Sequence, residues 1–351
     1  MRLAMFELSG NLWGIFLPVL KACRLEIQLL AVSLVFSLTP PALAQSLKLE
    51  WPVKCELGVD CFLQNYSDLV ESKKVLDPWC GEASYDGHKG TDIRVLSMAD
   101  IARNVAVIAG ADGAVKGVRD GMPDRLVRSD QDRDAVKNKE CGNGVLIDHG
   151  NGFETQYCHM KQGSVVVKTG SRVRTGDVLG YIGNSGLAQF PHVHVTLRKN
   201  GQWLDILTGS APSRSCKPFD TKNGYLSKAA IEGLPVDTRQ LLASGITGQP
   251  IKHDALVING VPSDIVASDK AIVGWGWFIN LAKGDVISLE ITGPGGFSVR
   301  NEAKPLEKQK ASYSAFAGRR VAPMSGTYLL KTLVSNGGKT VLEESREVII
   351  R

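Results

Sequence analysis

The sequence predicts an all-β protein with two β domains. Between residues 84 and 206 it is rich in Gly and Val, and its short apolar runs, such as "NVAVIAG" and "DVLGYIG", are bounded by Gly, Asn or Asp. No helical period persists through this region. Farther along, "DVISLEITG" and "GTYLLKTLVSN" alternate at the spacing of a β-sandwich. We therefore expect an antiparallel β domain over 45–222, a linker over 223–250 and a smaller β-sandwich over 251–351.

Residues 1–44 are expected to be a secretory signal peptide. Lys21 and Arg24 precede the apolar run "LEIQLLAVSLVFSL", and Ala42 and Ala44 supply small residues that favour cleavage after Ala44. Neither this run nor the earlier "LWGIFLPVL" reaches the roughly 20 apolar residues that a membrane-spanning helix needs. The sequence thus predicts a periplasmic or secreted protein without a stable membrane span.

The cysteine count agrees with export. The chain has seven Cys, and removing Cys23 with the leader leaves an even number for disulfides in an oxidising compartment. We expect Cys55 to pair with Cys61. The other four allow three connectivities, of which we expect Cys80 with Cys141 and Cys158 with Cys216. No CxxC pair occurs, so a zinc knuckle is not expected.

The first domain divides into short predicted strands. In order they are "TDIRV", "NVAVIAG", "GAVKGVR", "GVLIDHG", "FETQYCHM", "SVVVKTG", "DVLGYIG" and "PHVHVTL". Asn151-Gly152 has the signature of a tight hairpin turn, which would bring "VLID" against "ETQYCHM". Segment 119–140 is too polar to be core, so we expect a surface loop at the rim of a groove.

The charge pattern gives no sign of nucleic-acid binding. The formal net charge is +5 at pH 7, and no basic stripe with interleaved aromatic residues occurs. Nucleic acid is therefore not expected among the partners.

The C-terminal part is expected to be an immunoglobulin-like β-sandwich. Residues 208–222 form a turn-rich connector, and "DTRQLLAS" suggests a short helix within 223–250. Asn336-Gly337 predicts a hairpin turn. Trp275 and Trp277 share one strand face, where they could stack on a sugar, but such residues more often form core. Wall binding, binding of another envelope protein and simple spacing all remain open as roles for this domain.

Histidines in three predicted strands and turns suggest a metal site. In "PHVHV", His192 and His194 project from the same face of a strand. "HKGTD" supplies His88 and Asp92, and "ETQYCHM" supplies His159. A catalytic zinc site needs three protein ligands and a fourth position for water, which two His and one Asp would satisfy.

Each histidine motif is weak on its own. An isolated HxxxD or HxH is often a surface feature, and a lone strand histidine usually has a structural hydrogen bond. Their occurrence together in one β domain of an exported protein is what indicates a metal site. His149 and His253 have no such partners, and we assign both to structure.

The segments "HKGTD", "GNGVLIDHGNGFETQYCHM", "VKTGSRVRTGDVLGYIGNSG" and "PHVHV" resemble the lysostaphin-type, or LytM-like, zinc metallopeptidases. The resemblance covers roughly 84–206 and not the C-terminal domain. It implies a lysostaphin-like antiparallel β metallopeptidase domain with one Zn²⁺ per chain. The implied metal ligands are His88, Asp92 and His194, and the implied catalytic residues are His159 and His192.

The resemblance also implies a function, a zinc metalloendopeptidase that hydrolyses peptide cross-links of bacterial peptidoglycan through a metal-activated water. The chain lacks an HExxH motif, so the glutamate base of that other metalloprotease class is not available. The alternative is a noncatalytic cell-envelope module that binds wall peptide or activates a wall amidase. Such a module would not need the full set of metal-ligating residues.

Overall fold

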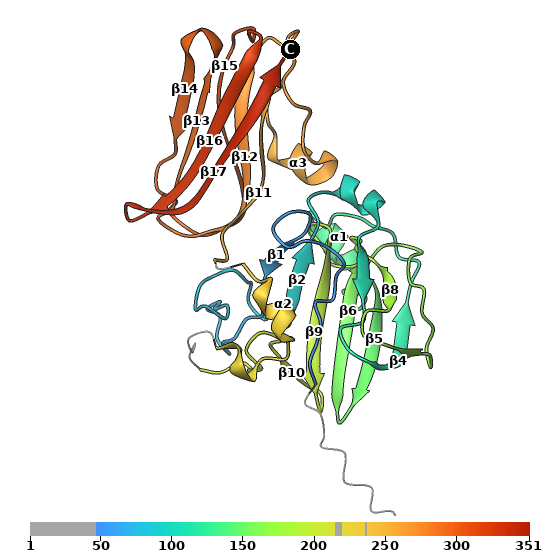
Figure 1. Cartoon of the computed structure of the whole chain (residues 1–351). Helices are drawn as coiled ribbons and strands as arrows, with labels where there is room; N and C mark the ends of the chain where they lie inside the picture. Colours follow the sequence, from blue (N-terminus) through green and yellow to red (C-terminus); the bar gives the residue numbers. More distant parts are fainter. Residues whose placement is uncertain (1–46, 215–219, 236) are drawn as a thin grey trace, which may run out of the picture. The chain divides into compact units, whose positions relative to one another are not determined.

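A computed structural model describes residues 47–214, 220–235 and 237–351 of the chain (Figure 1). The expected leader, 1–44, lies outside the described residues, as does Cys216. The described part is mainly β, and its sheets are antiparallel, which confirms the predicted fold class. No helix in these ranges is long and apolar enough to cross a membrane.

The first domain is built on an eight-stranded antiparallel sheet of order β1-β2-β9-β6-β5-β4-β7, with β10 paired to β9. Its strands are β1 (Phe62–Asn65), β2 (Thr91–Arg94), β4 (Gly113–Arg119), β5 (Asn143–Gly150), β6 (Phe153–Met160), β7 (Arg172–Val173), β9 (His192–Lys199) and β10 (Gln202–Leu204). A separate pair is formed by β3 (Ala106–Ile108) and β8 (Val178–Tyr181).

One face of this sheet forms the hydrophobic core, and the other face carries the polar residues of interest. Along β9, Val193, Val195 and Leu197 are fully buried in the core cluster. Because side chains alternate along a strand, His192 and His194 project from the opposite face, as the sequence predicted. The site therefore lies on a face whose position is fixed by the packing of the core behind it.

The predicted hairpin between β5 and β6 is confirmed. Asp148 pairs with Glu154, and Gly150 pairs with Phe153. Asn151 and Gly152 adopt φ values of 51° and 77°, which a tight turn of this kind requires.

Segment 119–140 follows β4 across the surface and contains one short helix, α1 (Asp130–Ala135). The Ser129 side chain caps the helix by accepting from the Asp132 backbone N–H, and no residue of the helix is buried. The backbone N–H of Val127 donates to the Ala188 carbonyl at 2.9 Å, which fixes the segment beside the turn that precedes β9.

The second domain is a β-sandwich of two antiparallel sheets, ordered β11-β12-β15 and β14-β13-β16-β17. Its strands are β11 (Gln240–Thr247), β12 (Ile272–Leu281), β13 (Val286–Gly293), β14 (Phe297–Glu302), β15 (Lys310–Arg319), β16 (Gly326–Asn336) and β17 (Lys339–Ile350). The remaining helices are α2 (Lys228–Glu232) and α3 (His253–Asn259), with short 3-10 helices η1 (Met98–Arg103), η2 (Thr221–Asn223) and η3 (Pro294–Gly296).

Buried side chains from both sheets meet in the sandwich. Ile246 and Ile272 come from one sheet, and Leu289 and Leu330 come from the other. The hairpin predicted at Asn336 is present between β16 and β17.

Trp275 and Trp277 are core residues, as predicted, with exposed fractions of 1% and 0%. They pack in a cluster that includes Phe62 of β1. Polar contacts reach the same strand, since Gln240 Nε2 donates to the Leu63 carbonyl at 2.8 Å and Asn280 Nδ2 donates to the Gln64 carbonyl at 2.7 Å.

The helix expected around "DTRQLLAS" is wrong, because residues 240–247 form strand β11 and pair with β12. Gln240, Leu242 and Ser244 are buried while Leu241 and Ala243 are less so, a period of two that suits a strand. Tertiary pairing overrides the helix propensity of Leu and Ala here. The range expected as a linker, 223–250, thus contains α2 and β11, and the domain boundaries at 222 and 251 stay a proposal.

The disulfides correct part of the expected pairing. Cys55 bonds to Cys61, as predicted, but Cys141 bonds to Cys158, so the expected pairs Cys80–Cys141 and Cys158–Cys216 are wrong. Cys80 is disulfide-bonded as well. The physical reason is the β5–β6 hairpin, which brings Cys141, two residues before β5, next to Cys158 near the end of β6, with the two Cα atoms 4.8 Å apart.

Candidate metal and catalytic site

Three neighbouring strands bring the predicted site residues to one face of the sheet. Asp92 on β2 lies opposite His194 on β9, and Cys158 on β6 lies opposite His194 from the other side. Residues directly opposite each other in an antiparallel pair share a face. His88, from the turn before β2, and His159, near the end of β6, complete the group.

The proposed metal ligands converge on one point. His88 Nε2 lies 3.1 Å from Asp92 Oδ1 and 3.0 Å from His194 Nδ1, and His194 Nδ1 lies 2.8 Å from Asp92 Oδ1. A tetrahedral zinc ion with bonds of roughly 2.0–2.2 Å separates its ligand atoms by about 3.3–3.6 Å. The three donor atoms therefore lie about half an ångström or less inside the shortest spacing that zinc requires.

Hydrogen bonds on the far side of each ligand leave lone pairs facing inward. His88 Nδ1 is 2.7 Å from the Tyr66 carbonyl, which only accepts, so this nitrogen carries the proton and Nε2 presents a lone pair. His194 Nε2 lies 2.8 Å from Thr196 Oγ1, which leaves Nδ1 for the shared point. Asn65 Nδ2 donates to Asp92 Oδ2 at 2.8 Å and leaves Oδ1 free.

Three inward lone pairs repel one another unless a cation lies between them. Burial raises the pKa of Asp92, but the neighbouring imidazoles of His88, His192 and His194 outweigh it and hold that pKa well below its usual range. Asp92 is therefore an anion at neutral pH. One carboxylate oxygen and two imidazole nitrogens are a ligand set that suits Zn²⁺, so the residues present fit the ion that the resemblance implies.

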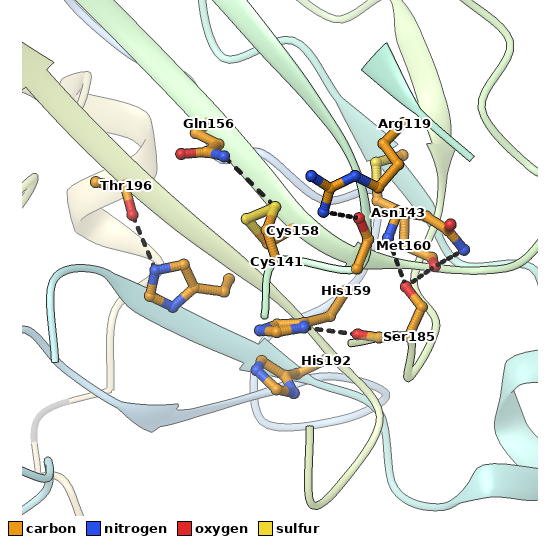
Figure 2. Close-up of a disulfide and its surroundings, with 12 residues drawn as sticks. Arg119, Cys141, Asn143, Gln156, Cys158, His159, Met160, Ser185, His192 and Thr196 are labelled. Carbon is orange, nitrogen blue, oxygen red and sulfur yellow. Dashed lines mark hydrogen bonds between the residues drawn. A yellow bond between two sulfur atoms is a disulfide. The ribbon is translucent and has the colours of Figure 1, made fainter. Parts of the chain in front are cut away.

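His159 and His192 lie beside this triad, with their ring centroids 4.6 Å apart. His159 Nδ1 donates to the Ser185 carbonyl at 2.8 Å, as Figure 2 shows, and His192 Nδ1 donates to the Phe190 carbonyl at 2.7 Å. Each ring therefore keeps an unprotonated Nε2. His192 Nε2 is 3.6 Å from Asp92 Oδ1, so this ring lies next to the three proposed ligands.

Burial keeps both of these imidazoles neutral. It lowers the pKa of His192, and it lowers the pKa of His159 well below its usual value, where the neighbouring His192 and His194 lower it further. A neutral imidazole with a free Nε2 can accept a proton near pH 7 and return it later, which is the work of a general base and acid.

The position of His159 depends on an irregularity that the sequence does not reveal. Strict alternation would place its side chain on the core face with Tyr157. Instead the β5–β6 register shifts between Asn143 and Val145, and His159 adopts a left-handed backbone with φ of 61°. Such bulges re-aim a side chain, and the strained conformation is retained only where the surroundings impose it.

A disulfide and a turn hold His159 in place (Figure 2). Cys158, the residue before His159, is bonded to Cys141. The Cys141 carbonyl also accepts a hydrogen bond from the His159 backbone N–H at 2.8 Å. Ser185 is fixed in turn, because its Oγ donates to the Met160 carbonyl at 2.7 Å and accepts from the Asn143 N–H at 2.9 Å.

Sequence reasoning missed Asn65, Gly90 and Ser185. A Cβ at position 90 would lie 2.8 Å from His194 Nε2 and 2.5 Å from the Val195 carbonyl oxygen, so only glycine leaves room for the His194 ring. Gly90 lies inside "HKGTD", and its place between His88 and Asp92 was a usable signal. The sequence around Asn65 and Ser185 contains no such signal, because the residues that they contact are distant in sequence.

The two remaining histidines differ in their surroundings. His149 has both ring nitrogens engaged, with Nδ1 2.7 Å from the Asp112 carbonyl and Nε2 2.7 Å from Thr155 Oγ1. His253 contacts Ser312 and Ser314, and it also lines a cavity that reaches the candidate site.

Comparison with known proteins identifies the family of the first domain. Residues 86–206 match the model described as Peptidase family M23. A protein named DD-carboxypeptidase/endopeptidase Mpg from Neisseria meningitidis is 32% identical over 106 residues, which covers 28% of this chain and 24% of that protein. Peptidoglycan DD-endopeptidase ShyA from Vibrio cholerae is 32% identical over 87 residues, covering 25% and 20%. The chain thus spans about a quarter of the length of these relatives.

Solved structures in the same comparison include the catalytic domain of lysostaphin from Staphylococcus simulans. The two sequences are 22% identical, the match covers 34% of this chain and 75% of the lysostaphin chain, and the TM-score is 0.24. The catalytic domain of the M23 protein EnpA from Enterococcus faecalis is 23% identical, and the match covers 41% of this chain and 88% of the EnpA chain with a TM-score of 0.28. The match to the family model identifies residues 86–206 of the chain as a peptidase family M23 domain.

Proposed function

We propose that the chain is an exported zinc-dependent endopeptidase that hydrolyses peptide bonds in bacterial peptidoglycan. The observation that carries the proposal is the convergence of three inward lone pairs, from His88, Asp92 and His194, beside two further imidazoles with free Nε2 atoms. The relatives named as peptidoglycan endopeptidases support the substrate class.

In this proposal His88, Asp92 and His194 hold one Zn²⁺. A bound zinc ion lowers the pKa of its water to about 7 and polarises the scissile carbonyl. Asn65 holds Asp92 by its outer oxygen and keeps the inner oxygen directed at the shared point. Gly90 keeps the space that the His194 ring occupies.

His159 and His192 move protons and stabilise charge. Their Nε2 atoms accept the proton of the attacking water, hydrogen-bond the developing oxyanion once protonated, and return a proton to the departing amine. The Ser185 and Phe190 carbonyls hold the two rings in the tautomer that this requires. Both rings are held by backbone groups, so little reorganisation is needed when substrate binds.

Export is part of the proposal and is supported by the cysteines. The described residues contain two complete disulfides, Cys55–Cys61 and Cys141–Cys158, and a disulfide-bonded Cys80. Structural disulfides of this kind persist in oxidising compartments such as the periplasm. Peptidoglycan is found in the same place.

The test uses the purified mature protein, purified sacculi and metal analysis. The protein should bind about one zinc ion per chain, and a chelator should abolish the release of muropeptides. His194→Ala should lose both zinc and activity, and His192→Ala should keep zinc but lose turnover. His149→Ala is the matched control, and it should retain both. Hydrolysis of sacculi by His194→Ala at the wild-type rate would rule out the proposal.

A further inference from the structure

A cavity of about 540 Å³ adjoins the candidate metal site and carries more positive than negative charge. Asp92 and His192 of the site line it, together with three arginines, Arg94, Arg128 and Arg133. Asp254 is the second acidic residue of the lining. Since Asp92 is already engaged by the histidines, three guanidinium groups face a single available carboxylate.

Arg94 is the most unusual of the three, because it is only 1% exposed and no described carboxylate is in ion-pair contact with it, although Asp100 acts on it from a longer distance. Its Nε donates to the Val95 carbonyl at 3.0 Å, one terminal nitrogen donates to the Leu96 carbonyl at 2.6 Å, and the other donates to the Gln64 side-chain oxygen. All three acceptors are neutral. Within the described ranges, no carboxylate lies within ion-pair distance of this guanidinium.

Arg94 remains charged despite this burial. A guanidinium keeps its proton in proteins, so this side chain is a buried cation. The guanidinium lies 4.9 Å from the centre of the Phe190 ring and 5.0 Å from that of Trp277, and such contacts stabilise a cation only in part. A buried charge without a contacting counter-charge is costly, and an anionic ligand in the cavity would offset that cost.

The other two arginines extend the positive charge toward solvent. Arg128 lies 3.7 Å from Asp254, but both side chains are exposed, so the pair is weak. Arg133 of α1 is exposed and makes no ion pair with any described residue. The polar segment 119–140 thus contributes two arginines to the cavity wall, one of them unpaired.

The position of Arg94 relates the cavity to the bond that would be cleaved. Asp92 and Arg94 are alternate residues on one face of β2, roughly 6.6 Å apart along the strand. Arg94 also lies directly opposite His192. An extended peptide advances about 3.3–3.6 Å per residue, so a group held by Arg94 lies within about two residues of a carbonyl held at the metal site.

We propose that this cavity binds a free carboxylate of the peptide substrate, within about two residues of the scissile bond, and that Arg94 and Arg133 supply the counter-charge. The proposal rests on the proposed function for the peptide nature of the ligand. The carboxylate proposal goes beyond the proposed function, because it makes the enzyme selective for peptides with a free carboxylate over the same peptides carrying an amide.

The test measures binding and does not depend on turnover. N-acetyl-D-alanyl-D-alanine and its C-terminal amide are titrated into the full chain by calorimetry, with and without zinc, because zinc itself could bind a carboxylate. The wild-type protein should bind the acid about tenfold more tightly than the amide in both states, as a charge-assisted bidentate contact predicts.

Variants then locate the source of that preference. Arg133→Gln should reduce it to less than about threefold, because one of the two counter-charges is gone. Lys137→Gln is the matched control. It removes the same charge from the same segment but lies outside the cavity lining, and it should keep the full preference. Arg94→Lys retains the charge but loses the planar fork, so it should give an intermediate preference, with folding verified by near-ultraviolet circular dichroism.

Three results would overturn the proposal: equal affinity of the wild-type protein for acid and amide, no binding of either, or a preference unchanged in both Arg133→Gln and Arg94→Lys. Hydrolysis of sacculi is measured separately. A protein that prefers the acid but releases no muropeptide would refute the proposed function and leave the carboxylate pocket standing.

Discussion

Each proposed metal ligand has a partner that sets its orientation. The Asn65 amide holds Asp92, the Tyr66 carbonyl holds His88, and Thr196 holds His194. Such outer contacts fix the tautomer and the direction of the lone pair, so their loss weakens metal binding even though the ligands remain.

Asn65→Ala should therefore lower zinc affinity by about 10- to 100-fold, because Asp92 would lose the bond that fixes its outer oxygen. Competition with a chromophoric chelator measures the change. Asn259→Ala, an exposed asparagine at the end of α3, serves as the control and should leave affinity unchanged. Equal zinc affinities for Asn65→Ala and the wild type would show that the contact does not support the ligand.

Gly90→Ala should abolish zinc binding, since the new methyl group would occupy space filled by the His194 ring and the Val195 carbonyl. Zinc content after dialysis is the measurement. Gly117→Ala offers a matched control, because a Cβ there meets nothing within 4 Å. A zinc-replete Gly90→Ala protein would mean that the ring can move aside.

His159 and His192 should titrate below the ordinary imidazole pKa near 6.5. Burial disfavours the charged imidazole of His159 and of His192. The folded protein therefore binds these two protons at a lower pH than the unfolded chain does. Their contribution to stability is present above pH 6.5 and is lost as the pH falls below it. NMR titration of the imidazole resonances in metal-free protein checks this. Midpoints at or above 6.5 would contradict it.

At the scale of elements, the strands explain which features could be predicted from the sequence. Alternation along β9 places His192 and His194 together, and Asn151-Gly152 sets the β5–β6 hairpin. The left-handed backbone of His159 could not be predicted, because it arises from a bulge that depends on the pairing of two strands and on the Cys141 segment.

Two further features of the elements could not be predicted from the sequence, for related reasons. The Cys141–Cys158 bond follows from strand register, which spacing between cysteines does not encode. Strand β11 was expected as helix, because "RQLLAS" has good helix propensity and its pairing with β12 is a tertiary effect. Local patterns thus predicted which residues share a strand face. Long-range strand pairing determined the disulfide partners and the strand conformation of β11.

The Cys141–Cys158 disulfide should matter for catalysis more than for metal binding. The double variant Cys141→Ser/Cys158→Ser should lose about 3 kcal/mol of stability, as closing a loop of this length predicts, and most of its kcat, because His159 would lose its fixed backbone. Zinc content should persist, since none of the three ligands is held by this bond.

Urea unfolding, metal analysis and kinetics on sacculi separate these effects. Cys55→Ser/Cys61→Ser is the control, because it removes a disulfide of the same chain that lies outside the site, and it should keep the wild-type kcat. Wild-type kcat in the Cys141→Ser/Cys158→Ser variant would show that the His159 position does not depend on the bond.

At the scale of the whole molecule, the β-sandwich contacts the strand that carries Asn65. Trp275, Trp277 and Phe62 share one buried cluster, and the Gln240 and Asn280 side chains bond to β1 carbonyls. The C-terminal domain therefore contacts the strand that carries Asn65 and lines part of the adjoining cavity through His253. This role was not evident from the sequence, which assigned His253 to structure alone.

The most direct test of the account is a crystal structure of the zinc-loaded protein, with the metal located by anomalous scattering at the zinc edge. We predict one ion bonded to His88 Nε2, Asp92 Oδ1 and His194 Nδ1 at roughly 2.0–2.2 Å, with an open fourth position facing His159 and His192. An ion bound elsewhere, or bound without Asp92, would contradict the account.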